Sequence, residues 1–339
     1  MNLANLNKII SDLKLPKFRE KQIIKAYFSN LDYGWDNVSV LAKELRSEFS
    51  EKLAWSSVVE KRLLSSNKDS LKAVLELFDK EIIETVLIRH KDGRNTVCVS
   101  SQVGCPLGCK FCATGKNGFR RNLSPEEIVD QVLYFGRILK KEGRKVTNVV
   151  FMGMGEPLLN YDNVLKSVRI LNDKEGFNLG ARHISISTCG IVPGIMKLSK
   201  EKIQLNLALS MHAPNNKKRS YFMPINERYG LEEVFKAVDF YIKTTNRRVM
   251  VEYLLIQDMN DKKEDAWRLA EIMKDRPLCY VNLIPYNSID AKFKTSSRER
   301  VAEFVDILKK EKIKHTIRYS FGDSIEAACG QLAGQNKKI

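Results

Sequence analysis

The feature that most constrains this fold is an alternation of strand-like and helical segments between about residue 96 and residue 320. Short apolar runs suit buried strands, and the residues between them repeat apolar side chains at helical spacing. Strands that alternate with helices usually pair in parallel through right-handed crossovers, so the pattern predicts an α/β fold. Six or seven such units fit a complete or partial (β/α) barrel. The expected strands are 96–100, 146–152, 182–188, 203–210, 248–256, 279–285 and 314–320, and the clearest helices are 125–141, 231–244, 262–274 and 297–310.

The segment before this alternation has a different pattern. Apolar residues recur at helical spacing in 6–13 and 23–28, and Pro16 separates these two stretches. Two loosely alternating apolar runs follow and predict extended chain with a hairpin-type turn at 91–95. The domains expected from these patterns are a small helical accessory domain (1–70), an extended linker or hairpin (71–95), the barrel (96–334) and a basic tail (335–339).

Three cysteines lie in one short loop directly after the first expected barrel strand: Cys105, Cys109 and Cys112. Thiolates are soft ligands, so three of them in a loop with Gly and Pro suit an iron–sulfur cluster or zinc. Cys-x-x-Cys pairs are common in zinc sites, but no second pair lies nearby. The position after a strand and the neighbouring Phe111 favour the cluster. A [4Fe–4S] cluster held by three cysteines leaves one iron open to an external ligand.

Further unusual motifs follow the ends of other expected strands. They are Gly-Met-Gly-Glu-Pro at 153–157, Ser-Thr-Cys-Gly at 187–190, Ser-Met-His at 210–212 and Pro-Tyr-Asn at 285–287. In a (β/α) barrel the catalytic groups gather at the carboxyl ends of the strands, so these motifs predict one composite site. Glycines allow a ligand to approach the backbone closely, and the carboxylate of Glu156 is suited to bind an ammonium group.

The charge of the chain indicates a polyanionic partner. The net charge is +16, and +14 of it lies in residues 91–339. A basic surface of this size favours nucleic acid as the partner, and a generally lysine-rich proteome is the alternative. The candidates for contacts with a phosphate backbone are Lys110, Lys116, Arg120, Arg121 and the Lys-Lys-Arg run at 217–219.

The sequence also predicts where the protein works. No apolar run approaches the roughly 20 residues that a membrane span needs, and the first residues do not resemble a signal peptide. Seven cysteines spread over this length do not form a disulfide framework. Together with a loop of thiolate ligands, they predict a cytoplasmic protein in a reducing compartment, without a membrane partner.

The cysteine loop resembles the signature of the radical S-adenosylmethionine (SAM) superfamily. In that superfamily SAM chelates the open iron, and an electron from the cluster cleaves SAM to a 5′-deoxyadenosyl radical. Over about residues 75–334, the chain also resembles the RlmN/Cfr family of radical SAM RNA adenine methyltransferases. The segments that carry this resemblance, together and in order, are 98–105, 151–160, 210–213, 223–226, 282–285 and 327–332.

The resemblance implies a partial (β/α)6 radical SAM barrel and a role for individual residues. Cys329 matches the methyl-carrying cysteine, Cys98 its partner, and Glu84 a glutamate proposed as a proton acceptor. Cys189 and Cys279 match no role in the family and are expected to be structural. The cluster ligands would be Cys105, Cys109 and Cys112, and the SAM contacts would be Gly155, Glu156, Ser187, Ser210, Met211, His212 and Asn287.

The chemistry implied by the resemblance explains why two cysteines are needed. Adenine C2 is electron-poor and does not attack the SAM methyl group directly, whereas a thiolate does. In the family, Cys329 would take a methyl group from one SAM, and the radical from a second SAM would activate it for addition to the ring. Cys98 would then help remove the ring proton, and a disulfide between the two cysteines would release the RNA.

The implied substrates are an adenine in the peptidyl-transferase region of 23S rRNA and the adenine 3′ to the anticodon in tRNAs. Such an adenine must be unstacked to reach the barrel. The resemblance also implies an electron donor such as flavodoxin or ferredoxin. Alternatives are methylation of C8 of the same rRNA adenine, which Pro157 argues against, a different radical SAM enzyme, or a non-catalytic metal-containing RNA-binding protein.

Overall fold

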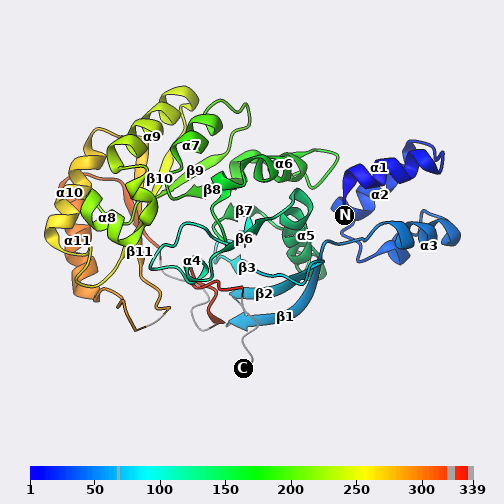
Figure 1. The fold of residues 1–339 in the computed structure, drawn as a ribbon, viewed down its shortest axis with the longest axis horizontal. Helices are drawn as coiled ribbons and strands as arrows, with labels where there is room; N and C mark the ends of the chain where they lie inside the picture. Colours follow the sequence, from blue (N-terminus) through cyan, green and yellow to red (C-terminus); the bar gives the residue numbers. More distant parts are fainter. Residues whose placement is uncertain (67–68, 290, 319–324, 335–339) are drawn as a thin grey trace.

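The computed structural model describes residues 1–66, 69–289, 291–318 and 325–334 and is organised around one large mixed sheet (Figure 1). In the described residues the strand order is β1-β2-β3-β4-β7-β8-β9-β10-β11-β12. The strands from β4 onward pair in parallel, which confirms the predicted α/β fold. The order ends in two separate edge strands, so the barrel is partial. The parallel strands are β4 (Asn95–Cys98), β7 (Asn148–Phe151), β8 (Ile184–Thr188), β9 (Asn206–Ser210), β10 (Val249–Leu255), β11 (Cys279–Pro285) and β12 (His315–Ile317).

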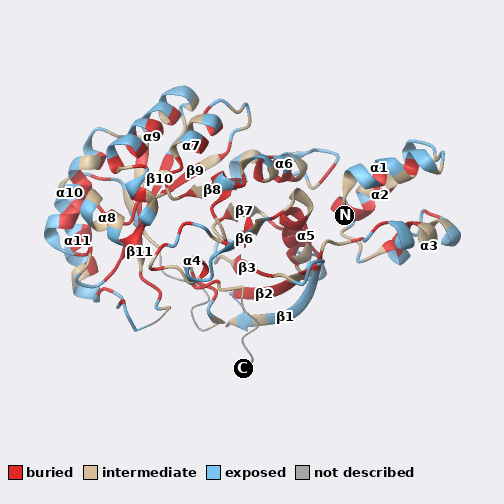
Figure 2. Ribbon diagram, viewed as in Figure 1, coloured by how far each residue is buried: buried red, intermediate tan, exposed pale blue. Residues whose placement is uncertain are grey.

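Helices connect the parallel strands and cover the outer side of the sheet (Figure 1). Figure 2 shows their buried residues facing the strands and their exposed residues facing outward. The first of them begins as predicted, because Ser124 and Glu127 form a capping box and Pro125 takes the first helical position. The helices are α5 (Pro125–Lys141), α6 (Tyr161–Asn172), α7 (Val192–Leu198), α8 (Asn216–Phe222), α9 (Leu231–Thr245), α10 (Lys263–Lys274) and α11 (Arg298–Lys310).

Short helices at the N-terminus form a separate group beside α5 (Figure 1). They are α1 (Leu3–Asp12), α2 (Phe18–Ile24) with its π-helical extension η1 (Lys25–Ser29), the 3-10 turn η2 (Trp35–Asn37) and α3 (Lys43–Lys52). Their core is aromatic, with Trp35 stacked on Phe49 at a centroid distance of 4.8 Å. The carboxylate of Asp130 in α5 accepts hydrogen bonds from the amino group of Met1 (3.2 Å) and the hydroxyl of Ser57 (2.6 Å). These buried contacts attach the N-terminal group to the sheet domain.

The structure differs from the prediction in one of the strands that precede the barrel. Residues 58–66, predicted to belong to the helical segment, form strand β1 (Val58–Ser66), whereas the two apolar runs predicted to be extended form β2 (Ser70–Leu77) and β3 (Ile82–Arg89). These three strands extend the parallel sheet in antiparallel fashion, ending with β3 on β4. Most of β1 is exposed, and it carries charged residues, as edge strands commonly do, so it lacks an apolar alternation. Its strand conformation depends on pairing with β2 rather than on local sequence.

A second, two-stranded sheet was also not predicted. Strands β5 (Gln102–Gly104) and β6 (Phe119–Asn122) pair in antiparallel fashion on either side of the cysteine loop, which contains the short helix α4 (Ala113–Lys116). These strands are too short to give an alternating pattern. The pairing places both ends of the cysteine loop on a rigid base.

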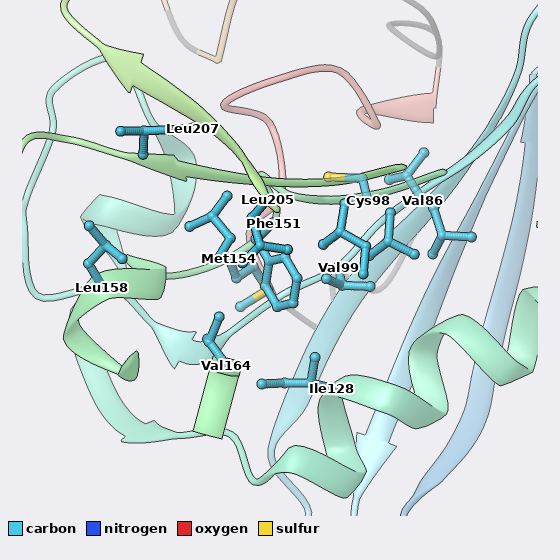
Figure 3. Close-up of a cluster of buried hydrophobic side chains, with 14 of the residues drawn as sticks. Val86, Cys98, Val99, Ile128, Phe151, Met154, Leu158, Val164, Leu205 and Leu207 are labelled. Atoms are coloured by element: carbon cyan, nitrogen blue, oxygen red, sulfur yellow. The ribbon is translucent and has the colours of Figure 1, made fainter. Parts of the chain in front are cut away.

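The hydrophobic core lies between the sheet and the covering helices. Figure 3 shows Val99, Ile128, Phe151 and Val164 packed in this region, with Cys98 beside Val86 at one side of the cluster. No helix in the described parts of the chain is long and apolar enough to cross a membrane.

Candidate active site at the carboxyl ends of the parallel strands

A cavity of about 140 Å³ lies where the cysteine loop meets the carboxyl ends of β7 to β11. This is the position that the barrel topology predicts for a catalytic site. The predicted site residues that line it are Cys105, Cys109, Cys112, Gly155, Glu156, Ser187, Ser210, His212 and Cys329. Met211 and Asn287 are buried beside it, while Cys98 lines a smaller neighbouring cavity. Glu84 lines neither cavity.

The cysteine loop is held in shape by its backbone. Gly104 has a φ of +74°, and the amide of Cys105 donates to the carbonyl of Gly118 at 2.8 Å. Within the loop, the amide of Cys112 donates to the carbonyl of Cys109 at 3.1 Å. Burial raises the pKa of the Cys112 thiol above its ordinary value. A thiolate at this position therefore needs a compensating cation.

The arrangement of the three thiols is compatible with a shared cluster. Among the residues that the structure describes, no three His, Cys, Asp or Glu side chains converge closely enough to hold one metal ion. Cys105, Cys109 and Cys112 instead line one common cavity. A cluster with several irons spreads its thiolate ligands, whereas tetrahedral zinc gathers them around one point.

A glycine-to-alanine exchange tests how far this loop depends on its backbone. A Cβ atom at Gly104 would lie 1.9 Å from the carbonyl oxygen of Gly118, so Gly104→Ala should cost about 2–5 kcal/mol of stability. Gly108→Ala is the matched control, because Gly108 also has a positive φ (+61°) but open space around it. We expect a clearly lower melting temperature and less bound iron for Gly104→Ala than for Gly108→Ala. Equal values would contradict this role of Gly104.

The Gly-Met-Gly-Glu-Pro segment places a carboxylate deep in the cavity. Glu156 accepts hydrogen bonds from the amides of Leu158 (3.0 Å) and Cys189 (2.8 Å). Burial raises the pKa of Glu156 to about 7, while the bonds from these two amides act in the opposite direction. Gly155 has a φ of +98°, and a Cβ atom there would lie 2.6 Å from Gln102. The segment therefore requires glycine at this position, and it offers an acceptor group suited to an ammonium ligand.

Side chains from β8 and β9 complete this wall of the cavity. The hydroxyl oxygens of Ser187 and Ser210 lie 3.4 Å apart. His212 adopts a left-handed backbone conformation (φ +55°), and its Nδ1 accepts a hydrogen bond from the amide of Leu254 at 3.1 Å. Burial lowers the pKa of His212 to about 3, so the imidazole is neutral and its Nε2 carries the proton. Its ring contacts Phe111 edge to face at 4.8 Å.

Two residues of this site were not identified as such from the sequence. Cys189, expected to be structural, lines the cavity and hydrogen-bonds through its thiol to Cys109. Arg219, expected on an RNA-binding surface, is fully buried and donates to the carbonyl of Cys189 at 2.6 Å and to Asn226 at 2.8 Å. The motif at 187–190 predicted that the end of β8 lies at the site, but neither the contact of Cys189 with Cys109 nor the burial of Arg219 follows from a local motif.

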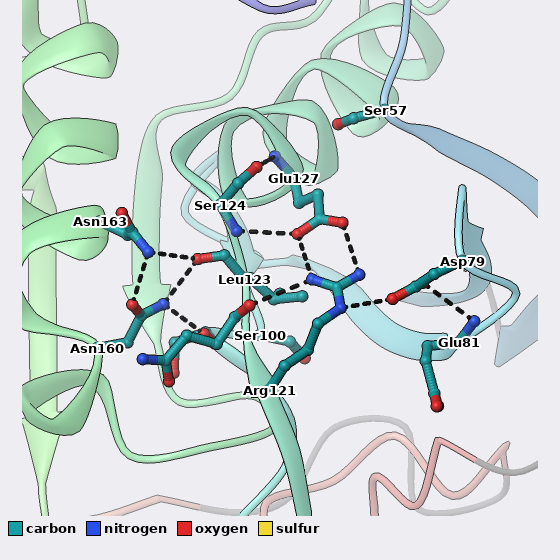
Figure 4. Close-up of polar contacts among 12 residues, drawn as sticks. Ser57, Asp79, Glu81, Ser100, Arg121, Leu123, Ser124, Glu127, Asn160 and Asn163 are labelled. Carbon is teal, nitrogen blue, oxygen red and sulfur yellow. Dashed lines mark hydrogen bonds and ion pairs between the residues drawn. The ribbon is translucent and has the colours of Figure 1, made fainter.

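Besides Arg219, two more of the basic residues predicted to contact RNA bind carboxylates within the protein. Arg121 lies between Glu127 and Asp79, at 2.8 and 2.6 Å, as Figure 4 shows. Lys218 pairs with the buried Asp265 at 2.6 Å. These side chains and Arg219 hold the fold together, so they are poor candidates for phosphate contacts. Of the predicted set, Lys116, Arg120 and Lys217 are exposed, and Lys110 lies over the ring of Tyr221 at 3.8 Å.

A smaller cavity of about 30 Å³ brings together the two cysteines that the sequence paired. Cys98 at the end of β4 and Cys329 in the C-terminal segment both line it, together with Arg318. Cys329 and Arg318 also line the large cavity, so the two spaces adjoin at these residues. Burial raises the pKa of Cys98 to about 12, and Asn287 donates to the carbonyl of Cys329 at 3.3 Å.

The C-terminal segment 325–334 is held in place by residues far away in the sequence. The carboxylate of Glu84 accepts a hydrogen bond from the amide of Ala333 at 2.8 Å and pairs with Lys72 at 3.5 Å. Lys72 also donates to the carbonyl of Glu326 at 3.1 Å. From the cysteine loop, the amide of Ala113 donates to the carbonyl of Gly330 at 2.7 Å. Cys329 is therefore placed by both β2–β3 and the cysteine loop.

Comparison with known proteins agrees with this arrangement. Residues 99–271 match the family model of the radical SAM superfamily. The chain is 45% identical over 331 residues to a probable dual-specificity RNA methyltransferase RlmN from Dictyoglomus turgidum, covering 97% of this chain and 94% of that protein. It is 41% identical over 335 residues to a ribosomal RNA large subunit methyltransferase N from Nitrosopumilus maritimus, covering 96% and 95%.

A solved structure agrees over the whole fold. The crystal structure of a radical SAM methyltransferase from Sphaerobacter thermophilus matches with a TM-score of 0.95 and 42% identity, covering 99% of this chain and 98% of that one. These relatives are named as methyltransferases, which argues against a non-catalytic RNA-binding protein. The chain belongs to the radical SAM superfamily and, within it, to the RlmN family of RNA methyltransferases, which use a [4Fe–4S] cluster and SAM.

Proposed function

We propose that this RNA methyltransferase methylates C2 of an adenine in the peptidyl-transferase region of 23S rRNA and of the adenine 3′ to the anticodon in tRNAs. The observation that carries the proposal is the position of Cys329, which lines the cavity of the cysteine loop and also the cavity of Cys98. A methyl group on Cys329 would face the place where the radical is generated. Cys98, the second cysteine that the reaction needs, would reach Cys329 from the smaller cavity.

The residues of the large cavity have distinct roles in this proposal. Cys105, Cys109 and Cys112 hold the cluster, and the bound cluster with SAM supplies the 5′-deoxyadenosyl radical. Glu156 accepts the ammonium group of SAM. This role of Glu156 is supported by the burial of its carboxylate and by the two backbone amides that donate hydrogen bonds to it. The remaining SAM contacts are Gly155, Ser187, Ser210, Met211, His212 and Asn287.

Cys329 is the methyl acceptor because its thiolate can attack the methyl carbon of SAM, which adenine C2 cannot. After the methyl carbon has joined the ring, the thiol of Cys98 takes part in removing the ring proton. We propose Cys98 for this role because it lines a cavity with Cys329, whereas Glu84 lines neither cavity. The thiolate of Cys98 then attacks the sulfur of Cys329, so that a disulfide forms and the bond from this sulfur to the methylene carbon breaks. The carbon keeps the electron pair of that bond and takes up a proton, which completes the methyl group of the product.

We assign Glu84 to anchoring the C-terminal segment rather than to proton transfer. Its carboxylate is already engaged by Lys72 and by the amide of Ala333. Glu84→Gln should therefore destabilise the segment by about 1–3 kcal/mol, seen as faster amide hydrogen exchange at 325–334. The matched control is Glu76→Gln on β2, whose ion pair with Lys80 lies at the surface.

The Glu84→Gln variant also distinguishes between an anchoring role and a role of Glu84 as the principal base. If Glu84 were the principal base, Glu84→Gln would accumulate RNA joined to Cys329 without loosening the segment. We expect that accumulation for Cys98→Ala instead. Covalent adducts are read on a denaturing gel, and hydrogen exchange is read by mass spectrometry.

The choice of C2 over C8 is tested on the product. The resemblance supports C2 through Pro157 after Glu156. Mass spectrometry of rRNA and tRNA fragments, from cells lacking the endogenous activity and expressing this chain, should find 2-methyladenine. Finding 8-methyladenine without 2-methyladenine would overturn the assignment, and a product in rRNA alone would remove the tRNA part of it.

The proposal also includes a partner and a location. The cluster requires one electron for each radical, and a flavodoxin or ferredoxin is the proposed donor. A reducing cytoplasm is the proposed compartment, supported by seven free cysteines. Lys110, Lys116, Arg120 and Lys217 remain the proposed phosphate contacts around the cavity mouth.

A further inference from the structure

Arg318 lines both cavities of the site, and the proposed function assigns it no role. It directly follows β12, and its amide donates to the carbonyl of Leu283 at 2.8 Å. It is the one charged residue among the described residues that line the smaller cavity. The other lining residues are Ile88, Cys98, Val150, Met152, Ile284, Ala327, Ala328, Cys329 and Leu332.

Arg318 shares the lining of the two cavities with a carboxylate and two thiols, Glu252, Cys98 and Cys329. Its charge acts on Glu252, Cys98 and Cys329. Glu252 is buried, and its Oε2 accepts a hydrogen bond from Asn282 at 2.7 Å. Its Oε1 is buried and has no hydrogen-bond partner in the described part of the chain. Glu252 is thus a buried carboxylate that can serve as a counter-charge of Arg318.

A thiol in such a cavity is a weak nucleophile unless a cation is near. Only the thiolate attacks a methyl sulfonium at a useful rate, and apolar surroundings disfavour it. Arginine is suited to this task because its guanidinium group stays charged even when it is buried. The other ionisable groups around the two cavities are Glu252, Cys98, His212, Glu156 and the cysteines of the loop with Cys189. His212 is neutral, so Arg318 is the cation available to Cys329 among these lining residues.

We propose that Arg318 stabilises the thiolate of Cys329 and so prepares this cysteine to accept the methyl group of SAM. The inference depends on the proposed function only in naming Cys329 as the acceptor. The thiol proton leaves to water. The electron pair of the sulfur then forms the bond to the methyl carbon, while the bond from that carbon to the sulfonium breaks and S-adenosylhomocysteine is released. The negative charge of the thiolate and the positive charge of the sulfonium are both lost in this step. Arg318 is then left with Glu252 as its counter-charge.

The test measures the reactivity of Cys329 in the cluster-containing enzyme without RNA or SAM. The probe is iodoacetamide, and alkylation is quantified on the Cys329 peptide by mass spectrometry across a pH series. Arg318→Met should move the pH of half-maximal alkylation rate upward by about 1–2 units, which is about 10- to 100-fold slower alkylation at neutral pH. Arg318→Lys should restore most of the rate. Cys279, a buried cysteine outside both cavities, is the internal reference.

A second variant tests the same proposal in the opposite direction. Glu252→Gln removes the counter-charge of Arg318, so the pH profile of Cys329 should move downward. The proposal is wrong if Arg318→Met leaves the profile unchanged while its circular dichroism and Cys279 reactivity match the wild type. If Arg318→Met does not fold, an unchanged or upward-shifted profile for Glu252→Gln overturns it. These outcomes are independent of whether Cys329 carries the methyl group, which the Cys329→Ala variant decides separately.

Discussion

Replacing Cys329 with alanine should abolish methylation of rRNA, with a loss on the order of a thousandfold or more, as for other essential nucleophiles. If the target is adenine C2, as proposed, the ring carbon cannot take the methyl group directly, and no second thiol among the described residues lines both cavities. Cys98 lines only the smaller cavity. The measurement is methyladenine in rRNA fragments after incubation with SAM and a reductant.

The control for this variant is Cys279→Ala. Cys279 is buried at the start of β11, outside both cavities, so the variant should keep the activity of the wild type. Cys329→Ala should also keep its visible cluster absorbance, because Cys329 is not a proposed ligand. Full methylation by Cys329→Ala would point to a different radical SAM mechanism.

Replacing Cys109 with alanine should remove the cluster and reduce methylation to background. Cys109 is the most deeply buried of the three loop cysteines, and it lies against Cys189 in the large cavity. Two remaining thiolates do not complete the ligand set of a [4Fe–4S] cluster with one open iron. Iron and sulfide content and the visible spectrum after anaerobic reconstitution give the readout.

Cys189→Ala is a demanding control because Cys189 lines the same cavity and contacts Cys109 directly. If the ligands are Cys105, Cys109 and Cys112, Cys189→Ala keeps its iron while Cys109→Ala loses it. Loss of iron in Cys189→Ala alone, with retention in Cys109→Ala, would mean that the ligand set is wrong.

The parts of the fold that the sequence predicted best are those with strong local signals. Helix α5 has the predicted bounds because its capping box and proline mark the start, and β11 has the predicted bounds because it is a buried apolar run. Strand β1 was missed because its exposed, charged side chains give no period, and only its partner β2 determines its conformation. Whether a strand lies at the edge of a sheet depends on its pairing with other strands, so a local sequence pattern does not reveal it.

The same distinction holds for the site. The cysteine loop and the strand-end motifs could be located from spacing together with the general rule for parallel barrels. The place of Arg318 at the cavities, the contact of Cys189 with Cys109 and the burial of Arg219 against Cys189 could not, because each depends on contacts between segments far apart in the sequence. Arg219 was misassigned because a basic run resembles an RNA-binding surface, while its burial depends on the approach of β8.

The anchoring of the Cys329 segment has a consequence for the order in which the enzyme is made. The contacts that hold this segment join Ala333 to Glu84 and Glu326 to Lys72, across 249 and 254 residues. Contacts of such long range form late, since the chain between them must be synthesised and ordered first. During translation the cysteine loop can fold long before Cys329 reaches it. If Cys329 carries the methyl group, as proposed, a nascent chain would be able to form its cysteine loop while still unable to modify RNA.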